Sequence, residues 1–189
     1  LAQLLRGERD PGEPSAHALH HPCFNLLNPA QHRAARIAVG TAEAALVHGP
    51  PGTGKTEVIT SLLKAFVSSG YRPLALAESN AAVDHLTLRA HRAGLKVIRL
   101  GHPERVDSQV RQFTFPVLVP QGSMGMVLAS LDRELSRIPT GGDHWQERRD
   151  LLDERRRLEM DARDALLSEA EVITSTFGTL ARQGPYLPK

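Results

Sequence analysis

The sequence is poor in the residues on which several classes of protein depend. Its 189 residues include one cysteine, Cys23, which excludes a disulfide framework within the chain and a cysteine-rich zinc site. Aromatic residues make up only 4%, so the core must consist mainly of leucine, valine, isoleucine and alanine. The longest uncharged stretch, residues 113–131, is interrupted by prolines and glycines and is not a membrane span. No basic-then-apolar signal peptide is found.

An excess of charge of one sign is also missing, because the formal net charge is only +2. A balance this small does not by itself indicate a nucleic-acid partner. Residues 89–111 are nevertheless locally basic, with six lysines and arginines against two acidic residues. The six are Arg89, Arg92, Lys96, Arg99, Arg105 and Arg111. The charge pattern alone leaves open whether they form a binding surface or an ordinary solvated one.

Residues 1–24 are typical of a leader or linker, since they are turn-rich and show no periodicity. Three histidines and the cysteine fall within seven residues: His17, His20, His21 and Cys23. Structural zinc sites usually combine two ligand clusters at a fixed separation, and no second cluster follows, so we expect no metal here. The first residue is Leu1 rather than methionine, and we expect the chain to be a piece of a longer protein.

From residue 28 onward, apolar runs alternate with helical patterns. Asn28 is a helix-capping residue with Pro29 in the first helical position, which predicts a helix over 30–39. The remaining predicted elements are strands at 44–48, 73–77, 95–100 and 171–176, and helices at 55–69 and 81–93. Because strands that alternate with helices pair in parallel, we expect an α/β fold with a parallel sheet.

Residues 113–168 interrupt this alternation with two helical patterns separated by a break at 139–142. The first pattern contains Leu128, Leu131, Leu135 and Ile138; the second, over 145–167, has Leu151, Leu158 and Ala165 seven apart, with Leu152, Ala162 and Leu166 beside them. We expect an antiparallel helical hairpin with one apolar seam. Its arginines are balanced by acids, which favours an ion-paired outer face over a nucleic-acid contact.

The segment Gly49-Pro-Pro-Gly-Thr-Gly-Lys-Thr56 matches the phosphate-binding pattern G-x-x-x-x-G-K-[ST] without a mismatch. It follows a predicted strand and precedes a predicted helix, which is the context that this loop requires. Its glycines allow backbone N–H groups to converge on an anion at a helix N-terminus. Lys55 is expected to hold the β- and γ-phosphates, and the Thr56 hydroxyl to be a ligand for Mg²⁺. The loop therefore predicts a nucleotide site.

Three further features bear on what the nucleotide site serves. The Gln31 amide carries a donor and an acceptor that match adenine, although alone it would be interpreted as an exposed helical glutamine. Small polar residues follow two predicted strands, over 78–84 and 174–179. The carboxyl ends of parallel strands are where open α/β sheets bind ligands, so these groups would suit a phosphodiester backbone. Each segment is also explained by helix capping, with Ser79 or Asn80 as the cap.

Taken in order, five segments resemble the first motor domain of superfamily 1 helicases, and most of all the Upf-type group. They are Leu27-Asn-x-x-Gln31, Gly49-Pro-Pro-Gly-Thr-Gly-Lys-Thr56, Ser79-Asn-Ala-Ala-Val-Asp84, Arg99-Leu-Gly-His-Pro-Glu-Arg105 and Val172-Ile-Thr-Ser-Thr176. The resemblance implies a P-loop NTPase with an incomplete RecA-like parallel sheet and an inserted α-helical hairpin. The implied organisation is a leader at 1–24, the first part of the ATP-binding core at 25–112, the helical insertion at 113–168, and a return to the core at 169–189.

The same resemblance implies ATP and Mg²⁺ as cofactors and single-stranded DNA or RNA as the partner, with 5′-to-3′ movement. It places Gln31 on adenine, Gly49, Gly52, Thr53, Gly54, Lys55 and Thr56 on the phosphates, with Thr56 also on the metal, and Ser79, Asn80, Ser175 and Thr176 near the nucleic acid. Lys55 and Thr56 are thus the expected catalytic residues. A second RecA-like domain of the parent chain is an implied partner and a membrane is not; we expect a cytoplasmic protein, or a nuclear one in a eukaryote.

Two departures from the family are visible. Glu78 stands where the family usually has proline. The family's apolar strand ending in Asp-Glu is not found, since Asp132-Arg-Glu134 falls within a predicted helix. Phosphoryl transfer needs metal, water positioning and charge stabilisation together, so we expect no hydrolysis by this segment alone. The alternatives are an AAA-type ATPase, which does not use Gln31 and Ser79-Asn80 in this way, and a non-hydrolysing nucleotide-binding regulatory module.

Overall fold

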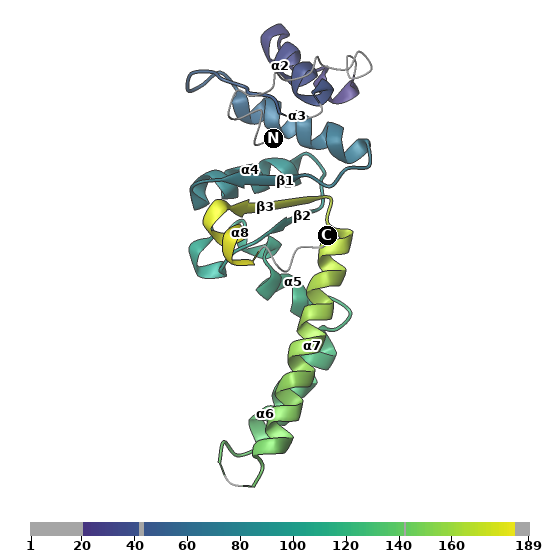
Figure 1. Ribbon diagram of the computed structural model, residues 1–189, viewed down its shortest axis with the longest axis vertical. Helices are drawn as coiled ribbons and strands as arrows, with labels where there is room; N and C mark the ends of the chain where they lie inside the picture. The colour runs from purple at the N-terminus through teal and green to yellow at the C-terminus, as the bar shows by residue number, and fades with distance from the viewer. Residues whose placement is uncertain (1–20, 42–43, 142, 184–189) are drawn as a thin grey trace, which may run out of the picture. The chain divides into compact units, whose positions relative to one another are not determined.

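A computed structural model of the chain describes residues 21–41, 44–141 and 143–183 (Figure 1). The chain divides into two compact units. Unit 1 comprises residues 1–73 and 89–95, and unit 2 comprises residues 74–88 and 96–189. Helix α4 (Asn80–Arg92) contributes residues to both units.

Unit 1 contains helices and loops in its described part. A short 3₁₀ helix, η2 (Pro22–Phe24), precedes α2 (Pro29–Gly40) and α3 (Lys55–Ser68), and α2 packs against α3. Asn28 caps α2 as predicted, in a capping box with Gln31. The core of the unit consists of Phe24, Leu27, Ala35, Val58 and Ala65.

The prediction of a strand at 44–48 is wrong. Residues 44–48 have no regular secondary structure, and Leu46 is 96% exposed. A strand forms only where a neighbouring strand offers backbone hydrogen bonds, and the described part of unit 1 contains none. The short apolar run therefore stays unpaired ahead of the phosphate loop.

Unit 2 contains a parallel sheet of three strands in the order β1-β3-β2. The strands are β1 (Leu74–Ala77), β2 (Val97–Arg99) and β3 (Val172–Thr176). In the central strand, Thr174 pairs with Ala75 on one side and Arg99 on the other. The parallel sheet and the α/β class are confirmed, with three strands in place of the four that were predicted.

The elements that follow β1 and β3 begin at the same edge of the sheet. Helix α4 follows β1 after two residues, and α8 (Phe177–Gln183) follows β3 directly. The segment after β2 carries two short 3₁₀ helices, η3 (Pro103–Arg105) and η4 (Arg111–Phe113). Inside, the Thr87 hydroxyl of α4 bonds the Thr174 hydroxyl of β3 at 2.7 Å. This arrangement gathers three polar segments at the carboxyl end of the sheet.

The predicted helical hairpin is present, and a short helix supports its base. The hairpin consists of α6 (Gly125–Arg137) and α7 (Trp145–Glu169), which lie side by side in Figure 1. The short helix at its base is α5 (Phe115–Gln121). Leu158, Ala162 and Leu166 lie in the apolar contacts of the hairpin. Leu152 and Ala165 are exposed, so their place in the predicted seam is wrong. Ala165 lies to one side of the stripe because a seven-residue repeat drifts around a straight helix. Leu152 lies beyond the other side, because one helical residue turns by about 100° from Leu151.

Ion pairs cover the outer face of the hairpin, as the balanced charge predicted. Arg155 Nε donates to Asp132 of α6 at 2.5 Å and Arg155 Nη1 to Glu159 at 3.0 Å. The hydrogen bond to Asp132 is the main reason that the pKa of Arg155 is raised above its usual value. Glu134 of the Asp-Arg-Glu segment is also exposed on α6. No helix in the described part of the chain combines the length and apolar composition needed to cross a bilayer.

Candidate functional site

The phosphate loop lies in unit 1 and leads directly into α3, which begins at Lys55. Gly52 and Gly54 have φ angles of 81° and 80°, a left-handed conformation that side chains rarely adopt. Gly54 is the N-cap of α3, and no side chain caps this helix end. Glu57 N donates to Gly54 O at 2.9 Å, whereas no side chain caps the N–H groups of Lys55 and Thr56, which a ligand can therefore accept. The glycine conformations and the helix start agree with the loop pattern, whereas the strand expected before the loop is not formed.

The Lys55 ammonium donates to carbonyl oxygens of the loop itself. Its Nζ contacts Gly49 O at 2.5 Å and Pro50 O at 2.8 Å. The Thr53 hydroxyl also donates to Pro50 O, at 2.8 Å. The carbonyl oxygens therefore hold the Lys55 ammonium at the loop, and this charge, together with the backbone N–H donors at the start of α3, fits the phosphates of a nucleotide.

Gln31 lies against the loop, 22 residues away in sequence from Thr53. Its Nε2 donates to Thr53 O at 3.0 Å, and its Oε1 accepts from Asn28 N at 3.1 Å. A glutamine amide has two N–H donors and two acceptor lone pairs, so each atom keeps one position for another partner. The structure brings Gln31 and the phosphate loop together, which the sequence implied only through the family resemblance.

Thr56 is the second residue of α3 and is half-buried. A hydroxyl in the first turn after a phosphate loop is a hard oxygen ligand of the kind that Mg²⁺ takes. Among the described residues, no group of three or more His, Cys, Asp or Glu is placed to hold a metal ion. His17 and His20 of the N-terminal cluster lie outside the described residues. Both ring nitrogens of His21 are hydrogen-bonded, to Cys23 N and to Ser68 Oγ.

The four residues predicted to lie near nucleic acid differ in their surroundings. Ser79 caps α4, with its Oγ accepting from Ala82 N at 3.2 Å. Ser175 is fully buried, and its hydroxyl donates to Thr176 O at 3.1 Å. Thr176 caps α8 by accepting from Thr179 N at 3.2 Å. Asn80 is exposed. Of these four, Asn80 and Thr176 line the same cavity.

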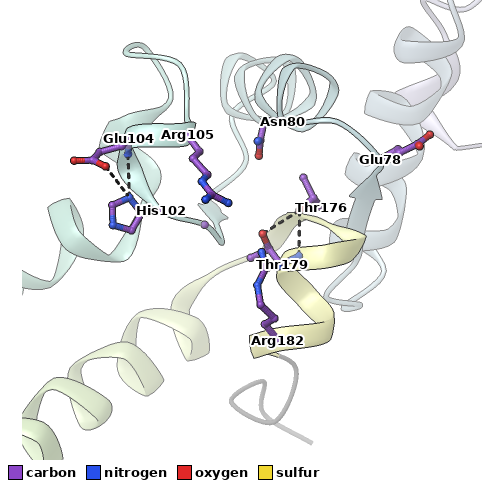
Figure 2. Close-up of a pocket in the computed structure, with 9 residues that line it drawn as sticks. Glu78, Asn80, His102, Glu104, Arg105, Thr176, Thr179 and Arg182 are labelled. Atoms are coloured by element: carbon purple, nitrogen blue, oxygen red, sulfur yellow. Dashed lines mark hydrogen bonds and ion pairs between the residues drawn. The ribbon is translucent and has the colours of Figure 1, made fainter.

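This cavity, which we call the groove, lies at the carboxyl end of the sheet within unit 2 and has a volume of about 620 Å³. It is lined by Glu78, Asn80, Gly101, His102, Glu104, Arg105, Thr176, Thr179 and Arg182. Figure 2 shows the Arg105 side chain extending into the middle of the groove, with Arg182 beside Thr179 on the opposite wall. Glu78 and Glu104 point away from the middle. The groove therefore presents donors to whatever occupies it, and suits an anion.

Below the groove lies a buried arginine that the sequence does not mark as different from its neighbours. Arg99, the last residue of β2, is 1% exposed and pairs with Asp84 of α4, Nε to Oδ1 at 3.1 Å. Its Nη2 donates to Asn80 Oδ1 at 2.7 Å, and its Nη1 to Leu100 O. One of the six basic residues of 89–111 is thus part of the interior rather than of a solvated surface.

Sequence reasoning gave no role to Arg105 or Arg182 and considered Thr179 only as part of the polar segment 174–179, although all three line the groove. The signal for Arg105 was the local excess of positive charge and its place in the segment that resembles the family. Thr179 and Arg182 lie three residues apart in α8, which puts them on one face of the helix. That spacing is visible only once the start of α8 is known.

A family model described as an AAA domain matches residues 26–137 of the chain. The DNA-binding protein SMUBP-2 of Rattus norvegicus is 30% identical over 169 residues, which cover 84% of this chain and 17% of that protein. The DNA polymerase alpha-associated DNA helicase A of Schizosaccharomyces pombe is 33% identical over 141 residues, 72% of this chain and 21% of the relative.

An ATP-dependent helicase of Methanocaldococcus jannaschii is 31% identical over 149 residues, 77% of this chain and 22% of its own length. The chain thus spans about a fifth of the length of these three relatives. The similarity to each of them includes a large part of this chain, and two of the three are named helicases.

Proposed function

The chain belongs to the AAA-domain family and to the Upf-type group of superfamily 1 helicases, and we propose that it is the ATP-binding part of a helicase motor that holds single-stranded nucleic acid. The observation that carries the nucleotide half is the uncapped start of α3 with Lys55 directed into the loop. The observation that carries the nucleic-acid half is the donor-lined groove at the end of the sheet.

For the nucleotide, each proposed contact uses a group of the loop or of the residue packed against it. The phosphates accept from the N–H groups of the loop and the first turn of α3, and the Lys55 ammonium exchanges its carbonyl partners for phosphate oxygens. The remaining N–H and lone pair of the Gln31 amide meet N7 and the exocyclic amine of adenine. The Thr56 hydroxyl is a ligand for Mg²⁺, which when bound neutralises the phosphate charge.

For the nucleic acid, the proposed contact is with the phosphodiester backbone. Asn80, Arg105 and Arg182 offer donors without a pattern that would distinguish one base from another. Thr176 also lines the groove and is included in the proposed contact. Ser175 is not included, because its hydroxyl is buried. Binding of this kind depends on salt and is similar across sequences.

The activity of the whole protein is a proposal as well. We infer a second RecA-like domain in the longer chain, 5′-to-3′ movement, and domain boundaries at 24, 112 and 168. The segment alone is expected to bind ATP without hydrolysing it, because Asp132 and Glu134 lie exposed on α6 and Asp132 is paired with Arg155. A steady-state phosphate-release assay on the chain tests this expectation, and turnover above about one per minute would contradict it.

The nucleotide half is tested by titrating the chain with a fluorescent N-methylanthraniloyl ATP in the presence of MgCl₂. Lys55→Ala is expected to weaken binding by at least about tenfold, because the phosphates lose a charged hydrogen-bond donor. The matched control is Lys64→Ala, which removes an exposed lysine from the same helix. Equal affinities for Lys55→Ala and the wild type would overturn the nucleotide assignment.

The nucleic-acid half is tested by the fluorescence anisotropy of labelled single-stranded 20-mers of DNA and of RNA, each in several sequences. Asn80→Ala is expected to weaken binding to the same degree for every sequence, because a contact with the phosphodiester backbone does not depend on which bases are present. A loss restricted to one sequence would argue against a backbone role. A chain that binds nucleotide but none of the 20-mers would favour the regulatory module.

A further inference from the structure

The guanidinium of Arg99 is the most enclosed charge in the described part of the chain, with a side chain that is 0% exposed. A buried charge needs both a partner of opposite charge and full hydrogen bonding. Asp84 supplies the first through its Oδ1, and the carbonyl oxygen of Leu100 accepts a further bond. These two partners already neutralise and anchor the group.

The third bond of Arg99 reaches the groove. Its Nη2 donates to Oδ1 of Asn80 at 2.7 Å, although Asn80 itself is exposed and lines the groove. Asp84 acts in a similar way, since its second oxygen accepts from Asp107 N at 2.8 Å. One ion pair in the interior thus holds both the Asn80 side chain and the backbone that follows Arg105.

The chemistry of this bond fixes the direction of the amide. Arginine has five N–H donors and no acceptor, so only the carbonyl oxygen of the Asn80 amide can face it. The NH₂ group must then face away from Arg99. Figure 2 shows the Asn80 and Arg105 side chains on neighbouring parts of the groove lining. The bond therefore occupies the acceptor end of the Asn80 amide and leaves its NH₂ donors for another partner.

We propose that Arg99 is a positioning residue for the nucleic-acid groove: it holds the Asn80 amide with its N–H donors directed at the phosphodiester backbone. This inference rests on the proposed function, since it assumes that the groove takes an anionic strand. A freely rotating amide would present its oxygen as often as its donors and would repel a phosphate in half of its orientations. By holding the oxygen, Arg99 excludes the orientations that would repel a phosphate, and it does so without contacting the nucleic acid itself.

The test is a double-mutant cycle between Arg99→Lys and Asn80→Ala, read out by the affinity for the labelled 20-mer of single-stranded DNA. Lysine keeps the charge opposite Asp84 but lacks the fork that reaches Asp84, Asn80 and Leu100 O together. Arg99→Lys is expected to weaken binding about fivefold in the wild-type background and to have no further effect when residue 80 is alanine. Arg137→Lys, at an exposed arginine that ends α6, is the matched control.

A second measurement keeps the inference testable if Arg99→Lys does not fold. The chain has three asparagines, Asn25, Asn28 and Asn80, and seven glutamines, so the side-chain NH₂ signals number ten and the Asn80 signal is identified by its loss in Asn80→Ala. The heteronuclear NOE of the Asn80 amide is expected to be that of a rigid group in the wild type, and clearly higher than that of the exposed Asn25. In a folded Arg99→Lys variant it should fall.

The outcomes separate this inference from the proposed function. An equal loss of binding from Arg99→Lys in both backgrounds, or an Asn80 amide as mobile as that of Asn25, overturns the positioning role and leaves the groove assignment in place. A wild-type chain that binds no 20-mer overturns the nucleic-acid half of the proposed function. In that case the Asn80 NOE of the wild type still decides whether Arg99 fixes the amide.

Discussion

Gln31 of α2 and Gly54 of the phosphate loop are in contact: a Cβ added to Gly54 would lie 2.3 Å from Gln31 Nε2. The glycine is thus required twice, once for its φ of 80° and once for the approach of the amide. The contact, together with the bond from Gln31 to Thr53 O, holds the amide at the edge of the loop.

Gly54→Ala should therefore damage the nucleotide site beyond its effect on stability. The left-handed backbone costs about 1 kcal/mol for an alanine, and the new methyl group also displaces the Gln31 amide. Gly70→Ala is the matched control, because Gly70 has a φ of 83° and no atom within 4 Å of the added Cβ. The midpoint temperature of thermal unfolding should fall by a similar amount in both variants. The affinity for the fluorescent ATP should fall about tenfold in Gly54→Ala alone. Equal affinities would show that the contact does not matter.

Gln31→Ala should lower the preference for adenine. Loss of two hydrogen bonds to the base is expected to weaken ATP binding about tenfold and to leave GTP binding unchanged, as measured by competition against the fluorescent nucleotide. The substitution also breaks the capping box of α2, which by itself destabilises the helix. Asn28→Ala breaks the same box, because the backbone N–H of Gln31 loses its acceptor, but it leaves the side-chain amide of Gln31 in place. A change in the ratio of ATP to GTP affinity in Asn28→Ala would contradict the assignment of Gln31.

The sequence was sufficient for the elements that local pattern determines. The period of the apolar residues and the capping residues located α2, α3, α4 and α7 to within a few residues. The run 44–48 failed because strand formation depends on a partner, and an apolar run carries no information about its neighbour. The phosphate loop was recognised without that strand, since its own spacing is specific.

The groove was harder to predict because its residues meet only through the tertiary fold. Arg99 and Asp84 are 15 residues apart, and nothing local distinguishes Arg99 from the exposed Arg105. Ser175 is buried because β3 is the central strand of the sheet. The order of the strands cannot be predicted from the sequence of any single strand. The family resemblance indicated segments whose residues line the groove, while the burial of individual side chains needed the structure.

The two arginines of the groove should each contribute one phosphate contact. Arg105→Ala and Arg182→Ala are expected to weaken binding of the labelled 20-mer and to reduce the slope of log K against log salt by about 0.7 each. Anisotropy titrations at several salt concentrations measure the slope. Arg137→Ala removes an exposed arginine that does not line the groove and should leave the slope as it is. If the salt slope changed in neither Arg105→Ala nor Arg182→Ala, the single-stranded nucleic acid would have to bind outside the groove.

The base of the helical hairpin depends on one close approach between backbones. A Cβ on Gly125, the first residue of α6, would lie 2.0 Å from Pro120 O and 2.6 Å from Pro120 C. A backbone carbonyl cannot rotate aside as the end of a side chain can, so Gly125→Ala has to move α5 and α6 apart. We expect a loss of about 1–3 kcal/mol in the free energy of unfolding, measured by urea denaturation.

Gly141→Ala is the control for this prediction, because Gly141 lies in the exposed turn after α6 and its added Cβ meets nothing within 4 Å. Its unfolding free energy should change by less than about 0.5 kcal/mol. Since the phosphate loop belongs to unit 1, the affinity of Gly125→Ala for the fluorescent ATP should remain that of the wild type. A Gly125→Ala variant as stable as Gly141→Ala would mean that α5 and α6 do not pack this closely, and that the hairpin tolerates a wider junction at its base.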